Sequence, residues 1–287
     1  MTKRGLLYVY AAATIWSTIG VVAKLGYTSG ANPHGVALTR SLFVFIIFLA
    51  ISLARYKSID IDAKPMLFGL LIIAPFHFSY MNAVDKLGVA VAVVLLYTAP
   101  IWVVTISATV YSEKPSKWEL LAVLLSILGI TLIYHPSEGP ADITVVGLVY
   151  GLLSGLLYGL FIVLSKHILL RKYSRWSSAR LAALAVAVQA WAFPTLLLSY
   201  IVTKGLVLTQ ADLISGAYLG IVSSVIAYYL FYRGLSVVTP SAASIAATLE
   251  PLLAVLWGVV FFHEQLSLSK WIGSLLIISS QLLLSKE

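Results

Sequence analysis

The sequence predicts an all-α membrane protein with ten transmembrane helices, arranged as two inverted repeats of five helices each. The first observation behind this prediction is composition, since 60% of the 287 residues are hydrophobic and only 10% are charged. An ordinary soluble domain has about 45–50% apolar and about 25% charged residues. The second observation is a series of long apolar runs along nearly the whole chain. The third is that the two halves of the chain repeat the same landmarks in the same order.

Ten apolar runs are long enough to cross a bilayer, because a helix needs roughly 20 residues to span about 30 Å of hydrocarbon. Short connectors separate the runs, and the longest connectors are 166–176 and 201–211. We therefore expect no soluble domain between the helices. The predicted spans are 6–27, 35–54, 65–84, 88–111, 118–134, 143–165, 177–200, 212–232, 240–262 and 268–284.

The first run follows Met1-Thr2-Lys3-Arg4, a charged start that is also typical of signal peptides. It continues to Tyr27, which makes it longer than the apolar core of a cleaved signal peptide, about 7–15 residues. We therefore interpret this run as the first span. The chain contains no cysteine, so it can form neither a disulfide nor a zinc–thiolate site.

Lysine and arginine predict the orientation, since the cytoplasmic loops of membrane proteins carry the excess of these residues. With the N-terminus inside, 14 of the 19 Lys and Arg residues fall on the inner side and 5 on the outer side. We therefore expect a multi-pass protein of the cell (inner or plasma) membrane with both termini in the cytoplasm. The same bias accounts for the net charge of +8 without a nucleic-acid partner. The five outer residues are Lys24, Arg40, Lys86, Lys204 and Lys270.

The two halves of the chain align on one another. Residues 5–24 match 147–166 without gaps, and Pro100 in the fourth run corresponds to Pro251 in the ninth. Because five helices cross the membrane an odd number of times, the second copy enters it from the opposite side. Inverted repeats of this kind are a recurrent architecture of transporters. The predicted repeats are residues 1–137 and 138–287.

Four short stretches of sequence stand out along the chain. Two of them are Ile15-Trp16-Ser17 in the first run and Leu38-Thr39-Arg40 in the second. The other two end the halves, as Tyr97-Thr98-Ala99-Pro100 on to Ser112-Glu113-Lys114 and as Leu249-Glu250-Pro251 on to His263-Glu264-Gln265-Leu266. With these four stretches in this order, the chain resembles the ten-helix EamA-type members of the drug/metabolite transporter superfamily and is similar to the aromatic amino-acid exporters.

This resemblance implies metabolite export, often of amino acids, through a central cavity between the two halves. It implies that spans one, three, four, six, eight and nine line the cavity and that spans five and ten are peripheral. One half would rock against the other around a site near the midplane, which gives alternating access. Two alternatives stay open: a translocator of lipids or other lipophilic compounds, and a non-transporting membrane enzyme or structural protein.

Glu250 is the most informative single residue, because a carboxylate in mid-span costs several kcal/mol unless it is protonated, paired or hydrated. Counting about 1.5 Å per residue puts it roughly 15 Å from the cytoplasmic edge, with no Lys or Arg at the same depth. It is either a proton carrier or counter-charge for a substrate ammonium, or a structural carboxylate beside Pro251.

His77 lies roughly 18 Å deep by the same count. It either relays protons with Glu250 or bonds a carbonyl freed by Pro75.

Four basic residues near helix ends allow more ordinary interpretations. Lys24 and Lys166 end the first helix of each repeat, where a long side chain can reach the interface. Lys24 alternatively closes the outer mouth or holds a substrate carboxylate. Arg40 and Arg180 lie near the starts of the second and seventh spans, and we interpret both as packing and topology residues.

Aromatic residues inside the spans are candidate contacts for an amphipathic or zwitterionic cargo, because each combines an apolar face with a polar tip. Any one of them is alternatively a core residue. Pro100 and Pro251 each free a carbonyl in mid-membrane, which is tolerable only beside protein or a cavity. We therefore expect these structural helix breaks to mark the pore axis. The aromatic candidates are Trp16, Tyr80, Tyr97, Tyr158 and Tyr228.

Glycines recur every four residues along the sixth span, and such a stripe predicts a seam where another helix packs closely. The sequence contains no complete form of the enzyme motifs that we considered. The segment from His263 to Ser267 begins like the HExxH zinc site but lacks the second histidine, and no Walker loop is present. We therefore expect no enzyme, no metal and no cofactor. The glycines of the stripe are Gly147, Gly151, Gly155 and Gly159.

The function predicted from these features is secondary transport that exports amino acids or similar small amphipathic metabolites across the cytoplasmic membrane. The expected partners are a small-molecule substrate, protons if Glu250 carries them, and the lipid bilayer. We expect a monomer or a homodimer.

Overall fold

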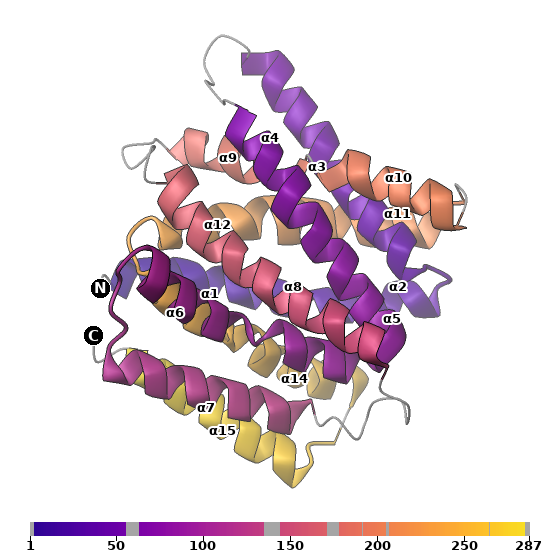
Figure 1. Cartoon of the computed structure of the whole chain (residues 1–287). Coiled ribbons are helices and arrows are strands. Elements are labelled where there is room, and N and C mark those ends of the chain that lie inside the picture. Colours follow the sequence, from indigo (N-terminus) through magenta and orange to yellow (C-terminus); the bar gives the residue numbers. More distant parts are fainter. Residues whose placement is uncertain are drawn as a thin grey trace.

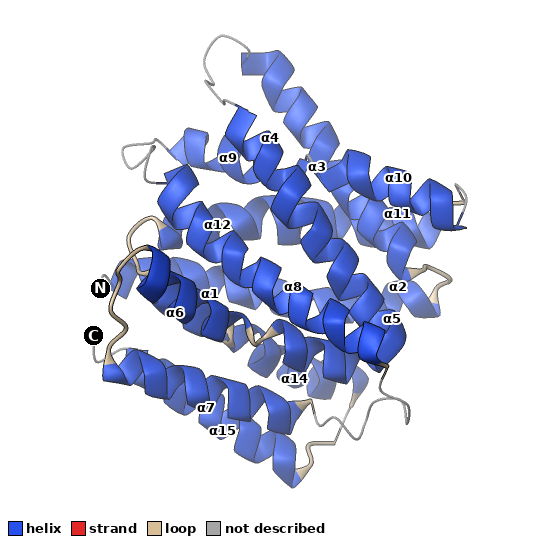
Figure 2. Ribbon diagram, viewed as in Figure 1, coloured by secondary structure: helices blue, strands red, loops and turns tan. Residues whose placement is uncertain are grey.

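The computed structural model describes the chain in seven segments, and all of the regular structure in them is helical (Figure 2). The all-α class is therefore confirmed for the described part of the chain. The predicted boundary between the two halves lies outside the described residues, as do most of the 166–176 connector, most of the 55–64 connector and Glu264. The described residues are 3–55, 63–134, 144–170, 178–190, 192–204, 207–263 and 265–284.

Helices follow one another along the whole described chain (Figure 1). The first half contains α1 (Lys3–Ser17), α2 (Ile19–Thr28), α3 (Pro33–Arg55), α4 (Ala63–Phe68), the π-helical η1 (Gly69–Ile73), α5 (Ala74–Leu96), α6 (Ala99–Val110) and α7 (Lys117–Ile133). The second half contains α8 (Val145–Leu164), the π-helical η3 (Ser165–Leu170), α9 (Ser178–Ala190), α10 (Ala192–Lys204), α11 (Gln210–Tyr218), the π-helical η5 (Leu219–Ile226), α12 (Ala227–Leu235), α13 (Pro240–Ala247), α14 (Leu249–Phe262) and α15 (Leu268–Leu284).

Seven helical stretches of the described chain are long and apolar enough to cross a membrane, and α6 and α15 are shorter apolar helices. One of the seven, Lys64–Leu96, contains Gly88 with φ 72° and ψ 166°, which is outside the helical region. Glycine adopts such a positive φ without steric strain, so two helical pieces meet at this point. The predicted number of ten spans stays a prediction.

Several predicted helix boundaries differ from the structure, including those of the first and sixth spans. The first predicted span is broken at Thr18, whose hydroxyl donates to the Ile15 carbonyl at 2.7 Å. The sixth span continues as π-helix to Leu170, so Lys166 lies in a helix rather than in the connector. There, the Lys166 ammonium donates to the carbonyls of Leu235 and Ser236 at 2.8 and 3.0 Å and satisfies the end of α12.

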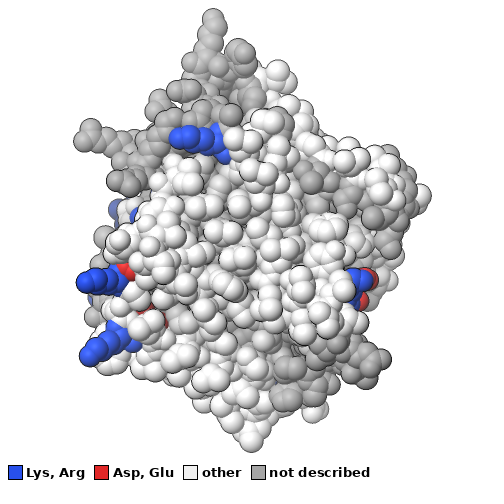
Figure 3. Space-filling model, in the orientation of Figure 1, with Lys and Arg blue, Asp and Glu red and all other residues white. Residues whose placement is uncertain are grey.

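The described ends of the chain, at Lys3 and Leu284, lie on the same side of the helix bundle (Figure 1). We call this the terminal side, and we call the opposite side, which holds the connection between α2 and α3, the far side. Charged side chains on the face drawn in Figure 3 lie toward the edges, and a broad uncharged belt separates them. Many large apolar side chains are also exposed, such as Leu7, Leu124 and Leu198. An exposed apolar belt of this kind suits a lipid-facing surface.

The glycine stripe of α8 is a packing seam, as predicted. A Cβ atom on Gly151 would lie 2.3 Å from Leu95, and one on Gly155 would lie 2.6 Å from the Leu95 carbonyl oxygen. A Cβ atom on Gly159 would lie 2.8 Å from Trp102. Because no side chain fits there, the backbone of α8 approaches α5 and α6 closely along the whole stripe.

Helices α7 and α15 pack against each other in antiparallel orientation at the edge of the bundle (Figure 1). The Ser126 hydroxyl donates to the Ser280 hydroxyl at 3.0 Å. One turn further along α7, Gly129 faces Gly273 of α15. A Cβ atom on Gly129 would lie 2.7 Å from the Gly273 carbonyl oxygen, and one on Gly273 would lie 2.5 Å from the Gly129 carbonyl oxygen. The contact is therefore reciprocal, and neither backbone leaves room for a methyl group.

We predict that Gly273→Ala destabilises the protein, because the added methyl group must displace the backbone of α7. Overpacking of this kind costs about 1–3 kcal/mol. Gly20→Ala is the matched control, since no atom lies within 4 Å of the position of its added Cβ atom. The melting temperature of each purified variant in detergent measures the effect. An equal melting temperature for Gly273→Ala and the wild type would show that the helices separate freely.

Candidate functional site

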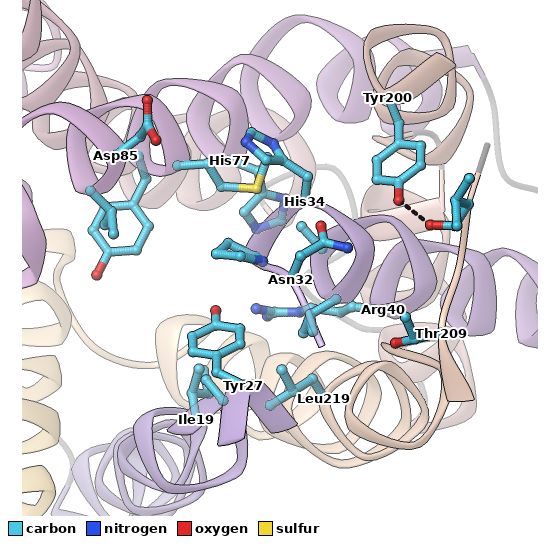
Figure 4. A pocket seen from close by; sticks show the side chains of 18 residues that line it. Ile19, Tyr27, Asn32, His34, Arg40, His77, Asp85, Tyr200, Thr209 and Leu219 are labelled. Atoms are coloured by element: carbon cyan, nitrogen blue, oxygen red, sulfur yellow. Dashed lines mark hydrogen bonds between the residues drawn. The ribbon is translucent and has the colours of Figure 1, made fainter. Parts of the chain in front are cut away.

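A cavity of about 540 Å³ opens at the far side of the bundle and reaches inward to Arg40 and His77 (Figure 4). Its volume lies within the range of small-molecule sites, about 300–1,000 Å³. Tyr27 and Asp85 stand at its exposed mouth. The lining residues come from α2, α3, α5, α10, η5 and the segment before α11. The second and seventh predicted spans therefore take part in this cavity, contrary to the expectation that spans one, three, four, six, eight and nine line it.

The rim of the cavity is held by Asp212 at the start of α11. Thr209 caps this helix, and its side chain and that of Asp212 each bond the other's backbone N–H in a capping box. The Asp212 carboxylate also accepts the Asn32 backbone N–H at 2.9 Å. Gly35 packs directly against this carboxylate, where a Cβ atom would lie 2.6 Å away. The start of α3 is thereby fixed against α11.

Arg40 lies two turns into α3, and its guanidinium points into the open space between Asn32 and Tyr27 (Figure 4). Its Nε donates to the Ser224 hydroxyl of η5 at 2.7 Å. The guanidinium interacts electrostatically with Tyr228, with Glu250 and with His77. The interpretation of Arg40 as a packing and topology residue is therefore too narrow, because it is a cation of the cavity itself.

Glu250 lies in the first turn of α14, directly after the helix break at Thr248. The N-terminus of a helix carries partial positive charge, which favours a carboxylate there. The Tyr97 hydroxyl is hydrogen-bonded to the Glu250 carboxyl group. Since Arg40 also interacts with it, Glu250 has a cationic partner that depth counting along the sequence did not identify.

The two central helix breaks have the same local structure. The Thr98 hydroxyl donates to the Leu95 carbonyl, and the Thr248 hydroxyl donates to the Ile245 carbonyl, each at 2.7 Å. Gln281 of α15 donates to the Ile245 carbonyl as well, at 3.1 Å. Pro100 and Pro251 follow the breaks and are buried. The carbonyls of Leu95 and Ile245 at the two breaks thus accept hydrogen bonds from protein side chains, as suits the membrane interior.

Aromatic side chains pack together at the centre of the bundle and form what we call the aromatic cluster. The Trp16 ring lies 5.2 Å from that of Tyr228, and its Nε1 donates to the Ser223 carbonyl at 2.9 Å. Tyr158 stacks on Phe76 with 5.5 Å between the ring centroids. All of these rings are buried. The cluster comprises Trp16, Phe76, Tyr158, Phe161, Tyr228 and Phe231.

Further contacts join the helix ends on the terminal side. The His167 ring stacks on Tyr111 with 3.7 Å between centroids and an interplanar angle of 9°. His167 Nε2 lies 3.3 Å from Glu113 Oε1. These contacts link η3 to the end of α6, so the bundle is tied together on the side opposite the cavity mouth.

The predicted site residues fall into three groups. His77 and Tyr80 line the cavity. Glu250 interacts with Tyr97, Tyr158 and Tyr228 at the centre of the bundle, and Trp16 belongs to the same aromatic cluster. Lys24 is not among the residues that line the cavity, and its ammonium lies 3.9 Å from the centre of the Phe262 ring.

Several lining residues were not among the predicted candidates, including Asn32, Thr209 and Asp85. The only sequence signal for Asn32 and Thr209 is that each lies three residues before a predicted span and is of a type that caps helices. Arg40 carried a clearer signal. Its charge lies inside the second predicted span, near the start of that span, and charges within a span usually face a bundle interior or a water-filled cavity.

Known proteins resemble the chain over nearly its full length. The profile of the EamA-like transporter family matches residues 3–135 and 145–286. The uncharacterized transporter YwfM of Bacillus subtilis is 29% identical over 97% of this chain and 93% of its own. The uncharacterized inner membrane transporter YicL of Salmonella typhimurium is 23% identical over 100% of this chain and 96% of its own.

A solved crystal structure has the same fold, with a TM-score of 0.82 over 98% of both chains at 18% identity. The family and the names of the relatives indicate a transporter rather than an enzyme, and they imply a small-molecule cargo and a lipid bilayer as the surroundings. The helices, the apolar surface and the two matched segments lead to one conclusion. The chain belongs to the EamA-like transporter family, within the drug/metabolite transporter superfamily, and is a multi-pass membrane protein.

Proposed function

We propose that this protein is a secondary transporter that exports amino acids or similar small amphipathic metabolites by alternating access. One observation carries the proposal: a cavity of about 540 Å³ that opens on one side and is lined by the Arg40 guanidinium, which interacts electrostatically with the Glu250 carboxyl group at the centre of the bundle. A zwitterion carries a negative charge that is complementary to the guanidinium and a positive charge that is complementary to the carboxyl group. The apolar wall, with Tyr80, Met81 and Val84, suits an uncharged side chain.

Access from one side at a time is the property that separates a transporter from a channel. The cavity is open at the far side, whereas the aromatic cluster and the contacts of His167 with Tyr111 and Glu113 occupy the centre and the terminal side. This arrangement suits one end state of an alternating cycle. In the other end state, the terminal-side contacts separate and the rim around Asp212 and Asn32 closes.

The ten spans form two inverted repeats in our proposal, residues 1–137 and 138–287. The matching breaks at Thr98 and Thr248 support it. So do Ser112 and His263, the non-glycine residues with positive φ among the described residues, which follow Pro100 and Pro251 by the same interval. The antiparallel packing of α7 on α15 further supports it, because equivalent helices of inverted repeats run in opposite directions.

The cytoplasmic side is the terminal side in our proposal, and the membrane is the cell (inner or plasma) membrane. The charge bias of the connectors supports this orientation, and the name of the YicL relative, an inner membrane transporter, supports this membrane. The cavity then faces the outside, which is the state from which an exporter releases its cargo.

Labelling from outside tests the orientation on a chain that has no natural cysteine. Ser29 and Lys117 are both exposed and lie on opposite sides of the bundle. We expect an impermeant maleimide to label Ser29→Cys in intact cells and to label Lys117→Cys only after the cells are opened. The reverse pattern would invert the proposed orientation.

Efflux from liposomes tests the function itself. Proteoliposomes loaded with the twenty standard amino acids should release at least one of them faster than protein-free liposomes do, as measured by mass spectrometry of the outer solution. A phospholipid reporter in the membrane of the same liposomes tests the alternative of lipid translocation, because a lipid translocator moves the reporter between leaflets. Equal release from both kinds of liposomes would contradict amino-acid export.

Glu250 should be required for proton-coupled flux rather than for folding. Glutamine keeps the shape and the hydrogen bond with Tyr97 but has no titratable proton, so Glu250→Gln should lose the pH dependence of flux. It should keep some exchange of bound cargo, since exchange needs no net proton movement. Flux at a series of pH values, together with the melting temperature, measures both effects.

Glu119→Gln is the matched control for this experiment. Glu119 is also buried, but it caps α7 by accepting the Ser116 N–H at 3.0 Å, away from the cavity. Its loss should lower stability and leave the pH profile unchanged. A wild-type pH profile in Glu250→Gln would contradict the proton-carrier role and favour a structural carboxylate.

A further inference from the structure

Arg40 presents an unused hydrogen-bonding edge to the cavity. Its single hydrogen bond among the described residues runs from Nε to Ser224 at 2.7 Å. A guanidinium has five N–H donors, and four of them are on the two Nη atoms. With Nε anchored on η5, the Nη atoms point into the open space shown in Figure 4.

A guanidinium held in this way needs an anion. Polar donors inside the membrane are costly when they lack a partner, and a fork of N–H donors binds a carboxylate through two parallel hydrogen bonds. Tyr228 and Glu250 interact with Arg40 electrostatically. However, Tyr228 is hydrogen-bonded to Gln189, and Glu250 is hydrogen-bonded to Tyr97. The edge of Arg40 is therefore available to a ligand.

The charges around the cavity restrict the anion. Asp85 stands at its mouth, and Glu250 lies close enough to interact with Arg40. A phosphate, which carries nearly two negative charges at neutral pH, would be repelled by both carboxylates and has one arginine to bind. A carboxylate carries one charge, and an ammonium next to it would be attracted by Glu250.

We propose that Arg40 binds the carboxylate of the cargo through its Nη edge, with Ser224 as the positioning residue that orients it. This inference rests on the proposed function and adds a specificity rule to it. The cargo must carry a carboxylate, and its ammonium faces Glu250. Its side chain lies against the apolar wall formed by Tyr80, Met81 and Val84.

The rule predicts how wild-type protein discriminates among close analogues. The probes are the twenty standard L-amino acids, their α-amides, and the amines that result from decarboxylation. Binding to the purified protein in detergent is measured by the rise in melting temperature with ligand concentration. We expect at least one amino acid to bind and its amide and amine to bind at least about 30-fold more weakly, as for loss of one partner of a buried charge pair.

Substitutions then assign the effect to Arg40. Arg40→Gln should weaken binding of the amino acid at least about 30-fold and remove the discrimination against its amide. Arg40→Lys should fall in between, because an ammonium keeps the charge but not the fork. Arg233→Gln is the matched control, since Arg233 bonds Tyr229 at 2.7 Å outside the cavity, and we expect it to bind like the wild type.

Three results would overturn the inference: no amino acid binds, the amide binds as tightly as the acid, or Arg40→Gln binds like the wild type. If Arg40→Gln does not fold, two measurements still test the inference. One is the comparison of the amino acid with its amide on the wild-type protein, and the other is the binding of the amino acid to Arg40→Lys. The outcome is separate from that of the proposed function. A protein that binds amino acids through Arg40 but moves none across liposomes would leave this inference standing and contradict transport.

Discussion

Backbone hydrogen bonding at two helix breaks shapes the centre of this protein. Inside a membrane, a carbonyl that a broken helix frees must be bonded by protein groups or by water in a cavity. Thr98 and Thr248 each bond the carbonyl three residues before them. Around the second break, Gln281 of α15 donates to Thr248 and to the Ile245 carbonyl, and Ser126 of α7 lies 3.4 Å from the Thr248 hydroxyl. The edge helices α7 and α15 therefore brace a break that lies at the centre of the bundle.

The position of the Glu250 carboxyl group depends on these breaks. Glu250 is in the first turn of α14 because a helix restarts after Thr248, and Tyr97, which bonds it, directly precedes the break at Thr98. Arg40 comes from α3 and is held by Ser224 of η5. Each half of the chain thus contributes one charge and one polar group that positions the charge of the other half. In the proposed alternating-access cycle, a relative movement of the halves would change the distance between Arg40 and Glu250 and would thereby couple the occupancy of the site to the conformation.

Composition and periodicity determined much of this protein from the sequence alone. The apolar excess and the spacing of the runs predicted a helical membrane protein, since few other structures satisfy the backbone in lipid. Repeated landmarks predicted the proline breaks, and four residues between glycines predicted the seam on α8. Glu250 and the aromatic candidates were also identifiable, because a charge or a polar tip in mid-span is rare. These features follow from local rules that act within one helix or one run.

Only the tertiary structure decided which side chains meet. Counting along a helix gives the depth of a residue, but not the neighbour that its side chain faces, and the reach of an arginine exceeds one helical turn. For that reason Arg40 was interpreted as a topology residue, although it faces a cavity near Glu250. The neighbour of Lys24 also came only from the structure, which places its ammonium over the Phe262 ring. The lining of the cavity by α3 and α10 likewise depends on how helices from the two halves cross, and crossing is set by packing between segments that are far apart in the sequence.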